Sequence, residues 1–148
     1  MSEHDLFLVH LVATAYMVGV IWFVQIVHYP LMLEVGDAAF CRYSRLHQSR
    51  TSYVVGPPML IEALSGLALI AWSPILRTSP AFYVSLALLT LVWLSTAFWQ
   101  VPLHKSFLQS CDRNAVERLV RTNWIRTIAW TGRAALIVGI GLGDFARG

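Results

Sequence analysis

Charged side chains are scarce in this chain: Asp, Glu, Lys and Arg make up 13% of its 148 residues, against about a quarter in an ordinary soluble domain. Hydrophobic residues make up 57%, and the mean hydropathy is +0.60. A soluble protein of this length has too much surface to hide so many apolar side chains. The composition therefore argues against a soluble domain and predicts a single integral membrane domain that covers residues 1–148.

Motifs that signal several common chemistries are also missing. The two cysteines, Cys41 and Cys111, do not form a CxxC motif, so a zinc ribbon or a thioredoxin-like protein has no support, and we expect two free thiols. There is no HExxH motif and no pair of ExxH motifs, which argues against a di-iron carboxylate bundle. The net charge of +3 is modest, and the basic residues of the chain are concentrated in two loops. Nucleic acid is therefore not an expected partner.

Four long apolar segments stand out, at residues 6–28, 52–75, 80–103 and 124–143. Each has the roughly 20 residues that cross about 30 Å of hydrocarbon as a helix, and only a helix satisfies its own backbone hydrogen bonds in lipid. The acidic start of the chain argues against a cleavable signal peptide, so the first segment is interpreted as a membrane span. The sequence therefore predicts an all-α four-helix bundle in the lipid bilayer, with an antiparallel hairpin at the short link 76–79.

The two long loops, residues 29–51 and 104–123, carry most of the basic side chains and show helical spacing of apolar residues. We expect each loop to contain a short amphipathic helix at the membrane interface that leads into the next span. The positive-inside rule places both loops in the cytoplasm and both termini outside, as in a protein of the bacterial inner membrane. The basic residues that support this topology are Arg42, Arg45, Arg50, Lys105, Arg113, Arg118 and Arg121.

The two halves of the chain share a pattern. Residues 47–51 and 123–127 both fit [His/Asn]-x-x-Arg-Thr. The pattern indicates a duplication with one repeat at about 6–75 and another at about 80–143. Because each repeat has two spans, the repeats would have the same orientation in the membrane. Chance similarity between apolar segments is the alternative.

Two charged residues, Glu62 and Arg133, lie deep inside predicted spans, where a charge costs roughly 2.5–3.5 kcal/mol on insertion scales. Counted from Arg50 and Arg126, they lie about 18 Å and about 10 Å into their spans. Two long side chains can bridge this difference, so we expect a buried ion pair. The pair could be structural, or it could be catalytic, with Glu62 handling protons and Arg133 holding an anionic group. Alternatively, Arg133 could donate to carbonyls freed where residues 57 and 58, both proline, kink or break the helix.

A second group of polar residues lies where the spans meet the two long loops, and an antiparallel bundle places them at one depth. Imidazole is a frequent ligand of first-row metals and haem, so the three histidines are candidate ligands of a transition metal or a haem. The remaining members are candidate substrate-binding residues. His10 lies about 27 Å away along its helix and cannot join them. The candidate ligands are His28, His47 and His104, and the candidate substrate-binding residues are Gln25, Arg50, Gln100, Asn123 and Arg126.

The segment 123–130, NWIRTIAW, resembles the anthrone-oxygenase-like family of small four-span membrane proteins, as does the placement of His or Asn and Arg at loop–helix junctions. Asn123 and Arg126 carry this resemblance. The overall plan is more distantly similar to the small four-span protoporphyrinogen oxidases, which bind haem. The resemblance implies redox chemistry.

Together these features lead us to expect a membrane oxidoreductase or oxygenase-like protein that acts on a hydrophobic, aromatic or quinone-like small molecule. The alternative is a non-enzymatic subunit of a larger membrane complex, with histidines that bind haem or pigment or simply pack. A transporter is a third hypothesis, for which four spans are few unless the chain forms a homo-oligomer.

Overall fold

The computed structural model describes residues 2–145, and nearly all of these residues are helical, with no strand among them. Four long apolar helical stretches make the chain an integral membrane protein: Glu3–Glu34, Asp37–Trp72, Pro80–Ser106 and Arg113–Gly143. The individual elements are α1 (Glu3–Phe23), η1 (Val24–His28), α2 (Tyr29–Leu31), η2 (Met32–Glu34), α3 (Asp37–Trp72), α4 (Pro74–Arg77), α5 (Pro80–Ser95), η3 (Thr96–Gln100), α6 (Val101–Ser106), α7 (Arg113–Ile140) and η4 (Gly141–Phe145).

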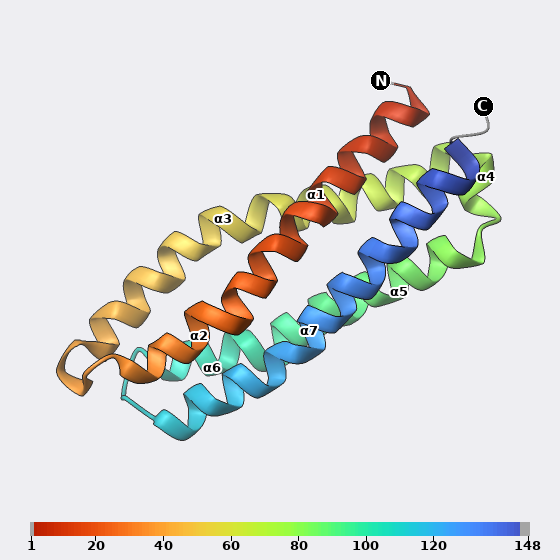
Figure 1. Cartoon of the computed structure of the whole chain (residues 1–148). Coiled ribbons are helices and arrows are strands. Elements are labelled where there is room, and N and C mark those ends of the chain that lie inside the picture. The colour runs from red at the N-terminus through yellow and green to blue at the C-terminus, as the bar shows by residue number, and fades with distance from the viewer. Residues whose placement is uncertain (1, 146–148) are drawn as a thin grey trace.

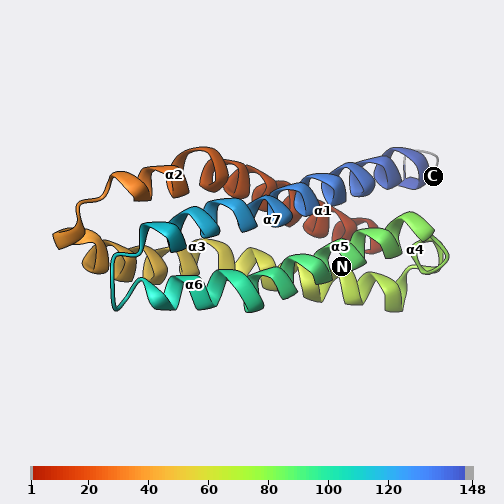
Figure 2. The same ribbon diagram turned by 90° about the horizontal axis from the view of Figure 1, so that it is seen from below.

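The predicted four-helix bundle is confirmed. The helices α1 and α7 lie side by side, α3 packs against α1, and α5 packs along α7 (Figures 1 and 2). The helices α3 and α5 make only sparse contact with each other apart from their connection through α4. The start of α1 and the end of α7 lie at the same end of the bundle, as an even number of spans requires (Figure 1).

Local sequence signals explain where the helices begin. Asp112 caps α7, because its side chain accepts a hydrogen bond from the backbone N–H of Ala115 at 3.2 Å. Pro80 occupies the first turn of α5, where its missing N–H costs no helical hydrogen bond.

The helical segments of the two long loops are present but are not separate interfacial helices. Residues 37–51 belong to the 36-residue helix α3, and residues 113–123 belong to α7. Neither stretch contains a glycine or proline. Extending an existing helix is easier than starting a new one, because nucleation fixes several dihedral angles for one hydrogen bond. The helix α3 is therefore about 54 Å long and extends well beyond the thickness of the hydrocarbon.

Prolines shape the helices without ending them. Pro57 and Pro58 lie inside α3, which changes direction near its midpoint but is not broken (Figure 1). Pro30 and Pro102 each follow a π-helical turn, η1 and η3 respectively. A proline clashes with the carbonyl four residues earlier and gives no N–H, and the wider π turn accommodates both defects. These turns hold several of the predicted site residues.

The two halves share an order of elements: a long helix, a π turn, a short helix and then another long helix. This similarity accompanies the sequence pattern at 47–51 and 123–127. The duplication itself, with its two repeats, stays a prediction.

Candidate functional site

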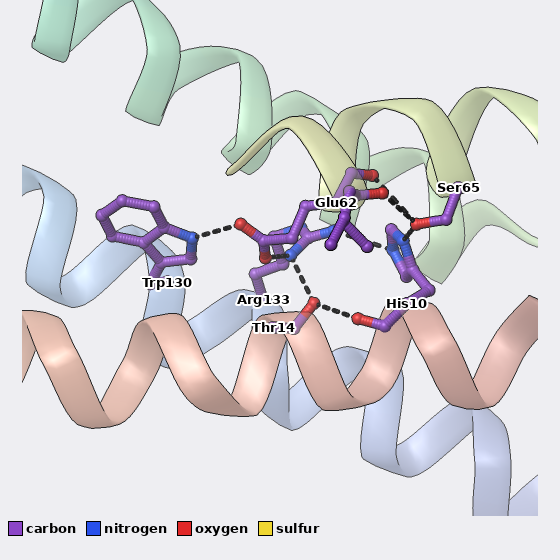
Figure 3. A network of polar contacts seen from close by, with 7 residues as sticks. His10, Thr14, Glu62, Ser65, Trp130 and Arg133 are labelled. Atoms are coloured by element: carbon purple, nitrogen blue, oxygen red, sulfur yellow. Dashed lines mark hydrogen bonds and ion pairs between the residues drawn. The ribbon is translucent and has the colours of Figure 1, made fainter. Parts of the chain in front are cut away.

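The predicted ion pair between Glu62 and Arg133 is present at the centre of the bundle. Both side chains are 0% exposed, and Nη1 of Arg133 donates to Oε1 of Glu62. Oε2 of the same carboxylate accepts a hydrogen bond at 3.0 Å from the indole Nε1 of Trp130 (Figure 3). Because both oxygens of Glu62 are satisfied, the desolvation cost of the carboxylate is largely offset.

Three further side chains complete this network (Figure 3). Arg133 donates through Nη1 to Oγ1 of Thr14 at 2.7 Å and through Nη2 to Nε2 of His10 at 2.7 Å. Nδ1 of His10 lies 2.7 Å from Oγ of Ser65. We call the six residues His10, Thr14, Glu62, Ser65, Trp130 and Arg133 the inner network.

The donors in the inner network fix the state of His10. A guanidinium can only donate, so Nε2 of His10 must accept from Arg133 and the ring is neutral with its proton on Nδ1. That proton goes to Ser65, whose hydroxyl donates onward to the backbone carbonyl of Ile61. The polar chain therefore ends on the backbone of α3 and does not continue to the surface.

The sequence identified Glu62 and Arg133 but not their partners. His10 was correctly excluded from the distant histidines, yet nothing connected it with Arg133. The sequence contained one signal that His10 faces the interior of the bundle: His10, Thr14 and Met17 follow each other at helical spacing and so share one helix face. All three are buried. The alternative partner for Arg133 is not observed, since none of the hydrogen bonds of the described residues joins it to a carbonyl freed by the prolines.

The three predicted histidines lie together near the end of the bundle that carries the long loops. Nε2 of His28 lies 2.8 Å from Nδ1 of His47, and the two rings stack with centroids 4.4 Å apart. The ring of His104 lies 5.3 Å from that of His47 and contacts the hydroxyl of Tyr29 through Nε2 at 3.0 Å. Tyr43 approaches His28 from outside, with its hydroxyl 3.5 Å from Nε2. We call His28, His47 and His104 the imidazole cluster.

The predicted amides form two separate contacts next to this cluster. Oε1 of Gln25 accepts from Nδ2 of Asn123 at 2.9 Å, and this pair is buried between α7 and the π turn η1. Gln100 donates through Nε2 to Oγ1 of Thr122 at 3.1 Å. Gln25 therefore ties η1 to α7, whereas Oε1 of Gln100 has no hydrogen-bond partner.

The two predicted arginines have different surroundings. Arg126 is 6% exposed and lies beside Tyr29, and its guanidinium lies 5.2 Å from the centre of the Trp130 ring. Arg50 is exposed on α3. The structure thus buries Arg126 and leaves Arg50 at the surface. Residues at the same depth can lie on different faces of their helices, so a residue's position in the sequence gives its depth but not the face on which it lies.

A cavity of about 300 Å³, which we call the central cavity, lies between α1, α3, η3 and α6, and Arg126 of α7 also lines it. Its volume is at the lower limit of ordinary small-molecule sites. The deeper part is lined by apolar residues such as Met17, Ile21 and Met59. The end nearer the long loops is lined by polar residues, among them Tyr29, His47, Gln100, His104, Lys105 and Arg126.

A shallower groove of about 360 Å³ lies on the other side of His47, between α1 and α3. It is lined by apolar residues together with His28, His47 and Arg50. His47 is therefore shared between the central cavity and this groove. Glu62 and Arg133 line neither the central cavity nor this groove, so the inner network is a separate feature. A catalytic role for these two residues stays a prediction.

No group of three or more His, Cys, Asp or Glu side chains within residues 2–145 has the arrangement to hold a metal ion. In the imidazole cluster, His28 and His47 turn nitrogens toward each other at hydrogen-bonding distance. A metal would need those lone pairs to converge on one ion at about 2.0–2.1 Å each, with further ligands. The present arrangement does not fit such a site, and metal or haem binding stays a prediction.

The fold and the cavity define the class: a membrane-spanning four-helix bundle with a closed inner network and a half-polar cavity. No protein family, curated protein or solved structure matches the chain. The functional argument therefore depends on the residues themselves.

Proposed function

We propose that the protein is a membrane oxidoreductase or oxygenase-like protein that binds a hydrophobic, aromatic or quinone-like molecule in the central cavity. The observation that supports this most is the division of the cavity into an apolar part and an end lined by His47, His104 and Tyr29. Such a lining suits a molecule with an apolar body and one polar end. The long loops would face the cytoplasm of a bacterium, whose inner membrane would hold the protein.

Redox changes of quinone-like rings are accompanied by proton transfer, and the cavity carries groups that exchange protons. His47 and His104 line its polar end, and imidazole is the side chain best suited to proton exchange near neutral pH. The hydroxyl of Tyr29 holds His104 through Nε2, which leaves Nδ1 of that ring without a protein partner. In this proposal His104 is the residue that gives or takes a proton at the bound molecule.

Haem or a transition metal remains part of the proposal as the electron carrier. If one is bound, its ligands would come from His28, His47 and His104 after the rings of His28 and His47 turn apart. The group would then supply the electron transfer, while the cavity would hold the organic molecule.

An absorption spectrum and metal analysis of the purified protein test this function. A Soret band or stoichiometric metal supports it, and His47→Ala should then lower the haem or metal content. His4→Ala is a matched control, since His4 lies about 36 Å from His28 along the same helical stretch. Protein that lacks both groups and fails to reduce or oxidise an added soluble quinone would contradict the proposal.

A non-enzymatic subunit of a larger membrane complex is the second candidate. One observation favours it: an outward-facing groove on α1 and α3, lined by Leu8, Val9, Val12, Ala13, Tyr16, Pro58 and Ile61, has almost no polar lining. Such a surface could contact a helix of another subunit or of a second copy. Co-purification of the protein with larger membrane partners, without haem or metal, would favour this candidate.

A further inference from the structure

The central cavity contains a buried positive charge that no carboxylate of the described chain neutralises. The ion pairs of residues 2–145 are Arg113–Asp37, Arg118–Asp112 and Arg133–Glu62, and Arg126 is in none of them although it is 6% exposed. Its contact with the Trp130 ring compensates only part of the lost hydration. A buried cation is costly unless it is paired, so the cavity lacks one negative charge.

Polar atoms at the same end of the cavity also lack partners. Nε of Arg126, Oε1 of Gln100 and Nδ1 of His104 are buried without a hydrogen bond, and all three residues line the cavity. Native proteins leave few such groups unsatisfied unless something binds there. Nε of Arg126 can only donate, so an acceptor oxygen of a bound molecule satisfies it, whereas Oε1 of Gln100 can only accept and needs a separate donor such as a water.

The tautomer of His104 gives the polar end of the cavity a second hydrogen-bond donor besides Nε of Arg126. The positive Arg126 lies beside Tyr29, and this favours the orientation in which a lone pair of the Tyr29 oxygen faces the guanidinium. The hydroxyl proton of Tyr29 is then directed to Nε2 of His104 at 3.0 Å. A neutral His104 therefore carries its proton on Nδ1. Two donors and a positive charge thus surround the polar end, which favours an anionic oxygen over a neutral carbonyl.

The direction of the cavity indicates where such an anion would come from. Met59 lies at the apolar part and His47 at the polar part, and this separation of twelve positions corresponds to about 18 Å along α3. The exposed lining residues are Ser52 on α3 and Val101 and Lys105 on α6, so the mouth lies between these two helices, which make little contact with each other. A hydrogen bond of 2.7 Å from Nε2 of Gln48 to the His104 carbonyl joins α3 and α6 at this point.

We infer that the central cavity binds a membrane-dissolved organic acid, either a carboxylate or a phenolate with an apolar tail, whose head is held by Arg126. The tail lies toward Met17 and Met59, and the head lies toward the loop end of the bundle, which is the orientation of an amphiphile in a bilayer. This inference rests on the proposed function only in that the cavity binds a hydrophobic molecule. It adds the charge of that molecule and the residue that recognises it.

Binding of pyrene-labelled dodecanoic acid and of its methyl ester to the full-length protein in detergent tests the inference. The acid should bind about tenfold or more tightly than the ester, since only the acid brings a charge to Arg126. A long-chain alkylphenol and an unlabelled fatty acid, each used as a competitor, distinguish the phenolate from the carboxylate. Equal binding of acid and ester, or displacement of the acid by neither competitor, would overturn the inference.

Variants then assign the preference to one residue. Arg126→Gln should remove the preference for the acid and leave ester binding nearly unchanged, while Arg126→Lys should retain part of it. Arg45→Gln is the matched control, since it removes an exposed arginine of α3 that lines neither the central cavity nor the groove beside it, and its acid preference should equal that of the unaltered protein. If Arg126→Gln does not fold, the comparison of acid with ester on the unaltered protein decides by itself whether the cavity prefers an acid.

The outcome also separates this inference from the redox proposal. Strong acid preference in a protein without haem, metal or quinone turnover supports the acid site and contradicts the oxidoreductase. Quinone turnover without any preference for the acid overturns the acid site and leaves the oxidoreductase in place.

Discussion

The guanidinium of Arg126 lies 5.2 Å from the centre of the Trp130 ring, and the indole nitrogen of the same Trp130 donates to Glu62. One side chain thus joins the central cavity to the inner network. The face of the indole contacts the cation that lines the cavity, while its edge holds the carboxylate that neutralises Arg133. Displacement of Arg126 by a ligand would therefore act on the packing of Trp130, a residue that is 0% exposed.

Replacing Glu62 with Gln should destabilise the protein by about 3–5 kcal/mol, because removing one partner of a buried pair leaves the charge of Arg133 uncompensated. The midpoint of thermal unfolding in detergent measures this effect. The double variant Glu62→Gln with Arg133→Met, which buries no charge, should recover part of the loss. Unchanged melting of the single variant would mean that the pair contributes nothing to stability.

Trp130→Phe should keep most of the packing but remove the hydrogen bond to Glu62. The free carboxylate oxygen then remains buried, and an unsatisfied buried acceptor typically costs about 1–3 kcal/mol. We expect a lower unfolding midpoint than in the unaltered protein, with a smaller loss than in Glu62→Gln. Trp124→Phe, at an exposed position of the same helix, is the control and should melt close to the unaltered protein.

Four spans should place both ends of the chain on one side of the membrane. Single cysteines introduced at Ser2 and Gly148, in a background without native cysteines, should react with a membrane-impermeant maleimide from the same face. Gly148 lies outside the described residues, so this experiment also tests a part of the chain that the structure does not address. Labelling from opposite faces would exclude an even number of spans.

Cys111 should react slowly with maleimide near neutral pH. Partial burial, together with the side chain of Asp37 at 3.4 Å from its sulfur, raises the pKa of the Cys111 thiol above its usual value. A higher pKa leaves less of the reactive thiolate, so the rate should rise with pH into the alkaline range. Asp37→Asn should lower the pKa and speed labelling at pH 7 in a Cys41→Ser background. An equal rate in both proteins would show that Asp37 does not control the thiol.

The sequence by itself determined the class of fold. Four apolar stretches of spanning length permit only helices in lipid, since the backbone has no other partners there. It also predicted that Glu62 and Arg133 pair, because a charge in hydrocarbon is costly without a partner, although carbonyls freed by the two prolines were an alternative partner for Arg133. The depth of the three histidines followed from the antiparallel order of the spans.

Only the tertiary structure decided which way the side chains face. Arg50 and Arg126 occupy equivalent places in the sequence pattern, yet one is exposed and the other lines a cavity, because packing of α7 between α1 and α5 turns that face inward. The partners of Arg133 were likewise hidden: His10 on α1 meets it only because α1 and α7 pack side by side. Sequence spacing fixes depth along a helix, whereas contacts between helices depend on rotation about the helix axes, which the packing of the whole bundle sets.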